Sequence, residues 1–368
     1  MIYVGGVIVL PGLYYFMAEE RVQLLVLIVC YRAADLVIDC LRSLEGEIAG
    51  IEDSRVIVCE NGTGEESVRV LAEAIEDNGW GEWVSLKVIS PNRGFAGGNN
   101  AVLRDVLQWE SVPEFVLLLN SDTIVRPGAL GALLEGAREH PEAGVIGARL
   151  EWPDGEGQIS CFRWLSPVSV MLSSARTGIL TKVFRRWDVP IPLSDEPIEA
   201  GWLSFACALI RREVLEEVGV LDDGYYLYFD DVDYCRRAWG KGWRVLYWPD
   251  AHVVHLRGRS NPVKEMTKAR KRRPKYYYFC RNRYFAKFYG GRWGLWVTNV
   301  FWYLGRTVSL LREMVRNKRP HVCEYEWLDI WTNFGDPMNY EHVPKQQDEV
   351  VVEVGERGGD TRDEHAAA

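Results

Sequence analysis

The stretch LLVLIVC, residues 24–30, is a continuous apolar run that ends at the polar pair Tyr31 and Arg32. A run of this kind predicts a buried strand. The segment LVIDCLRSL (36–44) follows it with apolar residues at helical spacing, which predicts a helix. A buried strand followed by a helix is the first unit of an α/β fold.

The alternation continues through three further pairs of segments. The expected strands and helices are RVIVC (55–59), ESVRVLAEAI (66–75), VSLKVI (84–89), NNAVLRDVLQW (99–109), FVLLLN (115–120) and PGALGALLEGARE (127–139). Strands that alternate with helices predict a mainly parallel sheet with helices on both faces. Sheets of this class bind ligands at the carboxyl ends of their strands.

Polar, turn-forming residues follow each of the four expected strands. They are Tyr31 and Arg32, then Glu60, Asn61 and Gly62, then PNRGFAGGNN (91–100), and then Asn120, Ser121, Asp122 and Thr123. Their shared position at strand ends predicts one cleft large enough for a nucleotide.

The Gly-rich segment 91–100 fits neither the GxGxxG nor the Walker spacing, which argues against a dehydrogenase and a P-loop NTPase. Gly94, Gly97 and Gly98 would let the backbone approach a ligand closely. A helix that starts near Asn99 would then offer free N–H groups to an anion. A plain Gly-rich turn is the alternative.

The alternation stops between about Trp152 and Glu199, where Pro, Trp and Ser become frequent. We expect loops there, on the far side of the cleft and suited to shaping an acceptor site. The elements expected after them are the strand GWLSFACALIRR (201–212), the helices REVLEEVG (212–219) and VDYCRRAW (232–239), and the strands WRVLYWP (243–249) and AHVVH (251–255).

Two segments carry candidate metal ligands. In LLLNSDT (117–123), Asp122 lies two residues after the amide of Asn120, and Mg²⁺ commonly takes one or two carboxylates together with substrate phosphates. An Asx turn would explain the same residues. His255 also follows a strand, and it is either a ligand beside metal or phosphate or a structural histidine.

The segment YFDDVDYC (228–235) places Asp230, Asp231 and Asp233 within four positions. Carboxylates at a helix start can bind its free N–H groups and interact with its dipole, so a solvated helix start is one interpretation. One acidic residue would suffice for that purpose, and three beside an aromatic run indicate a functional site.

Composition limits the classes of function. The chain has 368 residues, of which 48% are hydrophobic and 26% charged, as in a globular protein rather than a disordered one. A net charge of −9 argues against general nucleic-acid binding. Eight cysteines without a CxxC pair indicate buried, reduced thiols in a cytosolic protein.

Three segments bear on membrane association. IYVGGVIVLPGLYYFM (2–17) is interrupted by Pro11 and glycines, so it is a poor membrane span and is either an interfacial anchor or an upstream extension. GLWVTNVFWYLG (294–305) is short and flanked by arginines, which predicts an interfacial helix. KEMTKARKRRPK (264–275) is basic and would suit anionic lipid headgroups, and a solvated charged face over a packed helix is the alternative.

The order of the polar segments resembles glycosyltransferase family 2, and most of all its rhamnosyltransferase-like branch. The segments that carry the resemblance are CYR (30–32), CENGT (59–63), PNRGFAGGNN, LLLNSDT and the stretch from GWLSFACALIRR to AHVVH. The resemblance implies a GT-A fold, which is Rossmann-like with a mainly parallel central sheet flanked by helices. It also implies inverting transfer of a sugar from a nucleotide donor, usually with Mg²⁺ or Mn²⁺. A C-terminal amphipathic helical extension is expected beyond this fold.

The resemblance assigns residues to roles. It implies that Asp231 is the catalytic base, that Asp230 stands beside it in the place of a glutamate, and that Asp122 and His255 are metal ligands. The residues expected to bind the nucleotide sugar are Tyr31, Arg32, Glu60, Asn92, Arg93, Gly94, Asn120 and Ser121.

Acceptor contacts are expected from Trp202 and Asp233. The sequence departs from the family at Asn120, where an acidic residue is usual, and at Arg32 and Glu60, where Asn and Asp are common. These departures bear on metal affinity and on the nucleotide base of the donor.

Inverting transfer gives the acidic cluster a purpose. An acceptor hydroxyl attacks the anomeric carbon opposite the leaving diphosphate and loses its proton, which a carboxylate can take. A metal held by Asp122 would offset the charge that develops on the diphosphate. Neighbouring carboxylates could orient the acceptor or raise the pKa of the base by repulsion.

Four parts of the chain are expected. Residues 1–21 are an apolar extension, and 22–262 form a GT-A catalytic domain with a nucleotide-binding half (22–150) and an acceptor half (151–262). Residues 263–333 form a basic and aromatic helical region that associates with membrane, and 334–368 form a mostly disordered tail.

The predicted function is that of a hexosyltransferase on the inner face of the cell membrane. It would transfer a sugar, with rhamnose from dTDP-rhamnose as best guess, to a glycan or polyprenyl-linked acceptor in cell-surface polysaccharide assembly. The alternatives are a UDP- or GDP-sugar donor, a catalytically weak scaffold subunit, and a nucleotidyltransferase. The last has no Gly- and Lys/Arg-rich N-terminal loop to support it.

Overall fold

A computed structural model describes residues 2–4, 7–9, 22–256, 263–316 and 320–339. Four parallel strands form one half of the central sheet, in the spatial order β5-β4-β3-β6. The strands and the helices that connect them are β3 (Leu24–Cys30), α2 (Ala34–Ala49), β4 (Ser54–Asn61), α3 (Glu65–Asp77), β5 (Val84–Ile89), α4 (Gly94–Val106) and β6 (Phe115–Asn120). The predicted alternation of strands and helices is therefore confirmed.

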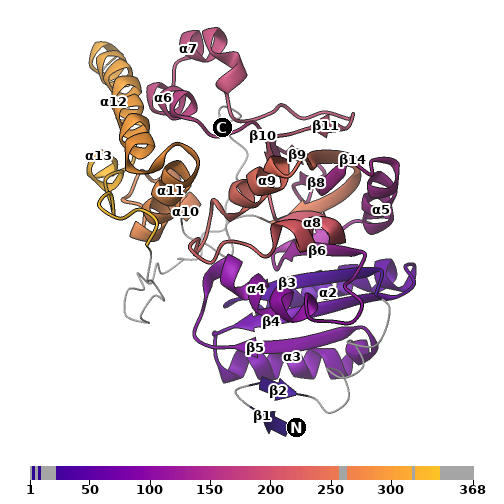
Figure 1. The fold of residues 1–368 in the computed structure, drawn as a ribbon. Coiled ribbons are helices and arrows are strands. Elements are labelled where there is room, and N and C mark those ends of the chain that lie inside the picture. Colours follow the sequence, from indigo (N-terminus) through magenta and orange to yellow (C-terminus); the bar gives the residue numbers. More distant parts are fainter. Residues whose placement is uncertain (1, 5–6, 10–21, 257–262, 317–319, 340–368) are drawn as a thin grey trace.

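The other half of the sheet is mixed rather than parallel. Strand β13 (Cys207–Arg211) is antiparallel to both β6 and β8 (Ala143–Glu151), and β14 (Arg244–His255) runs parallel to β8. Short strands complete it: β7 (Thr123–Val125) pairs with β14, β9 (Gly157–Gln158) with β8, and β11 (Ile198–Glu199) with β14. A single curled sheet thus carries both predicted halves (Figure 1).

Both faces of the sheet are covered, as the uninterrupted apolar strands predict. Along β3, Leu24, Val26 and Ile28 pack with α2 and α5 (Ala129–Glu139) on one face. Leu25 and Leu27 pack on the other face, in a cluster that includes residues of α4, α8 (Arg212–Val218) and α9 (Asp230–Gly240). Each face therefore has its own apolar core.

Three sequence-based boundaries were wrong. The strand expected at 201–212 is two strands, of which β12 (Trp202–Leu203) lies outside the central sheet and β13 lies within it. Helix α4 begins at Gly94 rather than near Asn99, so Gly97 and Gly98 lie inside its first turns. The two strands expected at 243–249 and 251–255 are one strand, β14, with a register shift between Trp248 and His252. Pro249, which cannot donate a hydrogen bond, lies in that shift.

The region 152–199, expected to be loops, contains helices. It holds β10 (Cys161–Phe162), α6 (Pro167–Ala175), α7 (Gly178–Val183) and the 3-10 turn η2 (Arg185–Trp187), and β10 pairs with β12 (Trp202–Leu203). Helix α6 packs against α12 (Gly291–Arg316), where Ser174 Oγ donates to the carbonyl of Trp302 at 2.9 Å. Part of this region therefore supports the C-terminal helices.

The C-terminal helices lie beside the sheet domain and contact it (Figure 1). They are α10 (Val263–Lys268), α11 (Lys275–Phe288), α12 and α13 (Glu326–Asp329). One apolar cluster joins Tyr278 and Tyr284 of α11 to Tyr225 and Val232 beside the acidic segment. Among the described residues, no helix is long and apolar enough to cross a membrane.

The chain termini are described only in part. Strands β1 (Ile2–Val4) and β2 (Val7–Val9) form an antiparallel hairpin, and the rest of the predicted extension 1–21 lies outside the described residues. Most of the predicted tail, 340–368, also lies outside them.

Candidate functional site

The pairing of β7 with β14 brings Asp122 and His255 together. His255 lies opposite Thr123 in this antiparallel ladder, and the N–H of Leu256 donates to the carbonyl of Asp122 at 2.9 Å. As a result, His255 Nε2 lies 3.4 Å from Asp122 Oδ1. Both side chains are buried, so two potential ligands separated by more than a hundred residues form one compact group.

The Asp122 and His255 pair suits a divalent cation. A carboxylate and an imidazole are ligands that Mn²⁺ accepts, and Mg²⁺ accepts the carboxylate. Nδ1 of His255 is buried and has no hydrogen-bond partner among the residues that the structure describes. Among the described residues there is no cluster of three or more His, Cys, Asp or Glu side chains.

Asn120 and Ser121 form the turn before this pair. The N–H of Asn120 donates to the carbonyl of Ala206 at 2.9 Å, and its carbonyl accepts from Thr123 Oγ1 at 2.7 Å. Ser121 is buried. Residues 121 and 122 form a turn between β6 and β7, and this turn presents Asp122.

The acidic segment begins α9 after a strained turn. Tyr228 and Phe229 have φ angles of 72° and 66°, a left-handed conformation that bulky residues rarely adopt. Their rings contact Tyr277 of α11, which holds the turn. Backbone strain of this kind is concentrated at functional sites, and here it fixes the direction in which α9 starts.

Asp230 and Asp231 are not solvated capping residues. Asp230 is 5% exposed and Asp231 is half-buried, and Asp231 Oδ1 accepts from the N–H of Val232 at 2.8 Å. Burial, together with the negative charge of Asp233, raises the pKa of Asp230 to about 7. Burial and the charge of Asp230 raise the pKa of Asp231 well above its ordinary value. The interpretation as a solvated helix start is therefore wrong.

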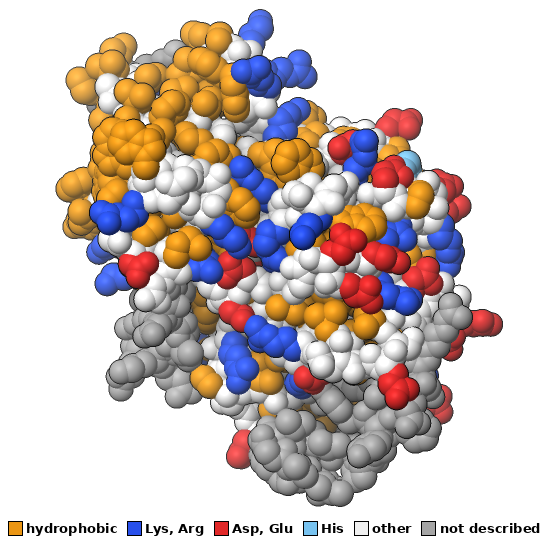
Figure 2. Space-filling view, in the orientation of Figure 1, with side chains coloured by type: hydrophobic (Ala, Val, Ile, Leu, Met, Phe, Trp, Pro, Cys, Tyr) orange, Lys and Arg blue, Asp and Glu red, His pale blue; other side chains and the backbone are white. Residues whose placement is uncertain are grey.

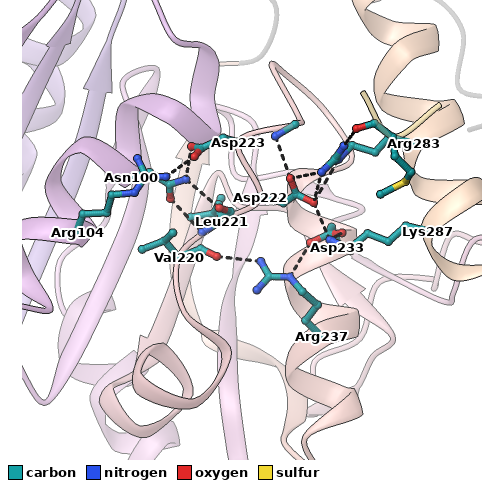
Figure 3. Close-up of polar contacts among 12 residues, drawn as sticks. Asn100, Arg104, Val220, Leu221, Asp222, Asp223, Asp233, Arg237, Arg283 and Lys287 are labelled. Carbon is teal, nitrogen blue, oxygen red and sulfur yellow. Dashed lines mark hydrogen bonds and ion pairs between the residues drawn. The ribbon is translucent and has the colours of Figure 1, made fainter. Parts of the chain in front are cut away.

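Asp233 belongs to an ion-pair network instead of facing solvent. It is fully buried, and its oxygens accept from Arg237 Nε at 2.7 Å and Lys287 Nζ at 2.6 Å (Figure 3). Lys287 also donates to Asp222, which Arg283 contacts in turn. Both oxygens of Asp233 therefore take part in ion pairs, one of which joins α9 to α11, and its predicted acceptor contact stays a prediction.

The same network reaches the nucleotide half of the domain. Asn100 of α4 donates to the carbonyl of Leu221 at 2.8 Å and to Asp223 at 2.6 Å, and it accepts from the N–H of Leu221 (Figure 3). Residues 221–223 therefore connect α4 to α11. Sequence reasoning missed Asp222, Arg283 and Lys287, because no local pattern pairs charges that lie so far apart in the chain.

Glu60 organises the turn after β4. It is 1% exposed, and its two oxygens accept from the N–H groups of Gly62 and Thr63 at 3.1 and 2.8 Å. Thr63 Oγ1 in turn accepts from the N–H of Arg32 at 2.8 Å. The carboxylate of Glu60 is therefore engaged by backbone N–H groups. Its predicted contact with a nucleotide base stays a prediction.

An open cavity lies at the carboxyl ends of β3 and β4. Its volume is about 510 Å³, and Arg32, Ala33, Thr63 and Gly64 are among its lining residues. Arg32 is exposed and lies beside the ring of Tyr31, with its guanidinium carbon 5.4 Å from the ring centre. These two predicted nucleotide-binding residues therefore lie together at the predicted edge of the sheet.

The segment 92–94 is held by Asn61. The Asn61 side chain accepts from the N–H of Arg93 at 2.9 Å and donates to the carbonyl of Gly94 at 2.8 Å, while Asn92 Oδ1 accepts from the N–H of Gly94. The predicted nucleotide-binding residues Asn92, Arg93 and Gly94 are thus fixed beside the end of β4.

The glycines of this segment serve internal packing. At Gly94, whose φ is 72°, a Cβ atom would collide with the carbonyl of Tyr226, and a Cβ at Gly98 would lie 2.7 Å from Val29. The N–H of Phe95 donates to the same Tyr226 carbonyl at 2.8 Å. The expected close approach of these glycines is therefore to the protein itself, and it docks α4 onto the turn that precedes the acidic segment.

Trp202 packs within the acceptor half. Its ring stacks on Phe162 with centres 4.1 Å apart, and Nε1 donates to the carbonyl of Arg163 at 3.0 Å. The ring is half-buried. Its predicted acceptor contact stays a prediction.

Comparison with proteins of known sequence gives two informative relatives. The N-acetylglucosaminyl-diphospho-decaprenol L-rhamnosyltransferase of Mycobacterium tuberculosis is 31% identical over 156 residues, which are 40% of this chain and 49% of that protein. The O-antigen biosynthesis protein RfbC of Myxococcus xanthus is 29% identical over 150 residues, 39% of this chain and 11% of its own. The chain therefore spans about half the length of the first relative and less of the second.

Comparison with solved structures supports the fold. The mannosyltransferase PcManGT of Pyrobaculum calidifontis, solved with GDP-Man and Mn²⁺, matches with a TM-score of 0.51 at 13% identity, over 83% of this chain and 78% of its own. The expected GT-A fold is thereby confirmed. The model of glycosyltransferase-like family 2 matches residues 22–275, which is more than half of the chain, so the protein belongs to that family.

Proposed function

We propose that this protein is an inverting, metal-dependent glycosyltransferase that moves a sugar from a nucleotide-diphosphate donor to a lipid-linked glycan acceptor. The observation that carries the proposal is the convergence of Asp122 and His255, 3.4 Å apart at the carboxyl end of the sheet. Family membership and the strained turn before Asp231 support it.

The proposed reaction assigns tasks to the residues of the chain. Asp122 and His255 would hold Mn²⁺ or Mg²⁺, which when bound would offset negative charge on the leaving diphosphate. Asp231 accepts the proton of the acceptor hydroxyl. The hydroxyl oxygen bonds to the anomeric carbon while the bond between that carbon and the diphosphate breaks. The raised pKa of Asp231 makes the ionised carboxylate a stronger base, and Asp230 raises that pKa further by its charge.

We propose rhamnose as the sugar and a polyprenyl-diphosphate glycan as the acceptor. Both rest on the name of the mycobacterial relative, which is an L-rhamnosyltransferase acting on a decaprenol-linked sugar. A UDP- or GDP-sugar is the alternative donor. An acceptor of this kind would place the protein at the inner face of the cell membrane, where it would assemble cell-surface polysaccharide.

The test is transfer from dTDP-rhamnose to a polyprenyl-diphosphate-N-acetylglucosamine acceptor in the presence of Mn²⁺. We expect Asp231→Asn to lower kcat by about 10²–10⁴-fold, because general-base catalysis contributes that much, and Asp230→Asn to lower it less. The proposal for the base is wrong if Asp231→Asn keeps near-normal transfer while Asp230→Asn abolishes it. Substituting UDP- and GDP-sugars identifies the alternative donors.

A further inference from the structure

The C-terminal half of α12 has the reverse of the usual polarity of a surface helix. Arg306, Ser309 and Glu313 lie on one face and are buried, at 8%, 0% and 7% exposed. Arg306 donates to Glu313 at 2.9 Å, and His321 contacts the same carboxylate at 2.9 Å. The polar face of this helix therefore points into the protein, where its groups are satisfied.

The opposite face of the helix is apolar and exposed. Leu304, Val308, Leu311 and Val315 recur every three or four residues and are 53%, 39%, 58% and 86% exposed. Met314 beside them is 72% exposed. An amphipathic helix of a globular protein normally turns such a stripe toward the core. The helix is therefore built for an apolar environment outside this chain.

Helix α7 extends the same surface. Ile179 and Val183 are 79% and 69% exposed. The helix follows α6, which packs on α12, and Arg312 donates to the carbonyl of Arg176 directly before α7. Figure 2 shows hydrophobic side chains gathered over the lobe that α7 and α12 form, with Lys and Arg side chains at its margin. We call the exposed apolar residues 179, 183, 304, 308, 311, 314 and 315 the apolar ridge.

The charge at the apolar ridge is opposite to that of the whole chain. Lys182, Arg185 and Arg186 are exposed directly after and within α7, and residues 163–187 contain no Asp or Glu. The chain as a whole carries a net charge of −9. A cationic margin around an apolar surface is complementary to an occupant that is anionic at its surface and apolar beneath it.

We propose that the apolar ridge docks on an anionic phospholipid bilayer. Its aliphatic side chains would enter the boundary between headgroups and acyl chains, and Lys182, Arg185 and Arg186 would contact phosphates. A symmetric pairing of two copies through this face would instead bring like charges together. The docking rests on the proposed function only in its purpose, which is to hold the site beside a lipid-linked acceptor.

The α12 part of this surface lies within the region 263–333 that the sequence predicts to associate with membrane, but it differs from the basic segment 264–275 within that region. Arg272 contacts Asp329 at 2.6 Å and Arg273 contacts Glu326 at 3.4 Å, so part of that charge is neutralised within the protein. The aromatic residues that follow in α11 pack against the turn before α9. The two surfaces therefore make different predictions.

The test is co-sedimentation of the full chain with vesicles of phosphatidylglycerol and phosphatidylcholine, against vesicles of phosphatidylcholine alone. We expect binding to the anionic vesicles, and a loss of at least ~10-fold in Leu304→Ser/Leu311→Ser/Val315→Ser at both low and high salt. We expect Lys182→Glu/Arg185→Glu/Arg186→Glu to lose binding chiefly at low salt, since salt screens its contribution.

The matched control reverses three exposed lysines elsewhere, in Lys268→Glu/Lys271→Glu/Lys275→Glu. It changes the net charge equally and should keep more binding than the reversal beside the ridge.

The inference is overturned if wild type does not bind, if this control loses as much binding, or if the Ser variant converts a solution dimer to monomer while binding vesicles normally. A nucleotide-induced thermal shift measured in every variant reports the proposed function separately, because the nucleotide cleft lies on other elements.

Discussion

Asp230 and Asp231 are adjacent at the start of α9, yet their surroundings differ. Asp230 is 5% exposed, whereas Asp231 is half-buried. A base must reach the proton that it takes, so access favours Asp231 for that role. Asp230 is better placed to modify its neighbour, because its negative charge adds to burial in raising the pKa of Asp231.

Burial of Asp230 should make stability depend on pH. Its pKa is about 7 in the folded protein against an ordinary value of 3.8, so the folded state retains this proton between about pH 4 and 7 while the unfolded state has lost it. Stability from this group therefore falls as pH rises through that window. We expect Asp230→Asn to raise the free energy of unfolding at pH 8, by on the order of 1–3 kcal/mol, and to change it little near pH 4.

Urea denaturation of Asp230→Asn and wild type at both pH values measures this difference. Asp250→Asn is the control, because it makes the same substitution at an exposed residue. An equal effect of Asp230→Asn at pH 4 and pH 8 would contradict a raised pKa.

Individual site residues could be predicted where they follow a strand. Asp122 and the Tyr31 and Arg32 pair lie where the strand-end rule places them. The role of Asp233 could not be predicted from the acidic cluster alone, because it depends on Lys287, which lies 54 residues further along the chain. Long-range ion pairs leave no periodic signal in one sequence.

At the scale of elements, apolar runs and periodicity predicted most strands and helices but not where each one begins and ends. The Gly-rich sequence at the start of α4 predicts a turn, because glycine has a low intrinsic helix propensity. In the structure, contacts with Val29 and Tyr226 require those glycines and override that preference. Pro249 interrupts the pattern of β14 without ending the strand, because the pairing resumes at His252.

Helix α11 should be required for the geometry of the acidic segment. Lys287 of this helix contacts both Asp222 and Asp233. Although burial works to raise the pKa of Asp222, Lys287 and Arg283 outweigh it and lower the pKa to about 2. We expect Lys287→Met to remove an ion-pair partner from the buried Asp233 and the half-buried Asp222, and to cost roughly 2–4 kcal/mol in the free energy of unfolding.

The control for Lys287→Met is Lys241→Met, which removes an exposed lysine directly after α9 and should change stability by less than about 0.5 kcal/mol. Denaturant titrations of the two variants beside wild type give the comparison. Equal, small effects of both substitutions would show that the network in Figure 3 does not hold α11 to the acidic segment.

At the scale of the whole molecule, one apolar cluster crosses the expected boundary between residues 262 and 263. Tyr225 and Val232 share an apolar cluster with Tyr278, Tyr284 and other residues of the C-terminal helices. Composition changes at this point, and that change was the basis for the boundary. Composition does not report where aromatic side chains pack, so the contact across the boundary was not visible in the sequence.

A chain that ends at residue 262 tests this packing. It would expose the cluster around Tyr225 and leave Asp222 and Asp233 without Lys287. We expect it to be aggregation-prone, with a weaker near-UV circular dichroism signal than the full chain, because large exposed apolar patches drive association. A soluble monomer with the near-UV spectrum of an intact catalytic domain would instead support two independent domains.

The central claim is that a metal held by Asp122 and His255 binds a nucleotide diphosphate at the carboxyl end of the sheet. The most direct measurement is the melting temperature with UDP, dTDP, GDP or CDP, each with and without Mn²⁺, in wild type and Asp122→Ala. We predict a rise for at least one nucleotide that needs Mn²⁺, with ~2.7 kcal/mol of stabilisation at a ligand concentration of 100 Kd, and its loss in Asp122→Ala. No shift in a folded wild-type protein, or an undiminished shift in Asp122→Ala, would contradict the claim.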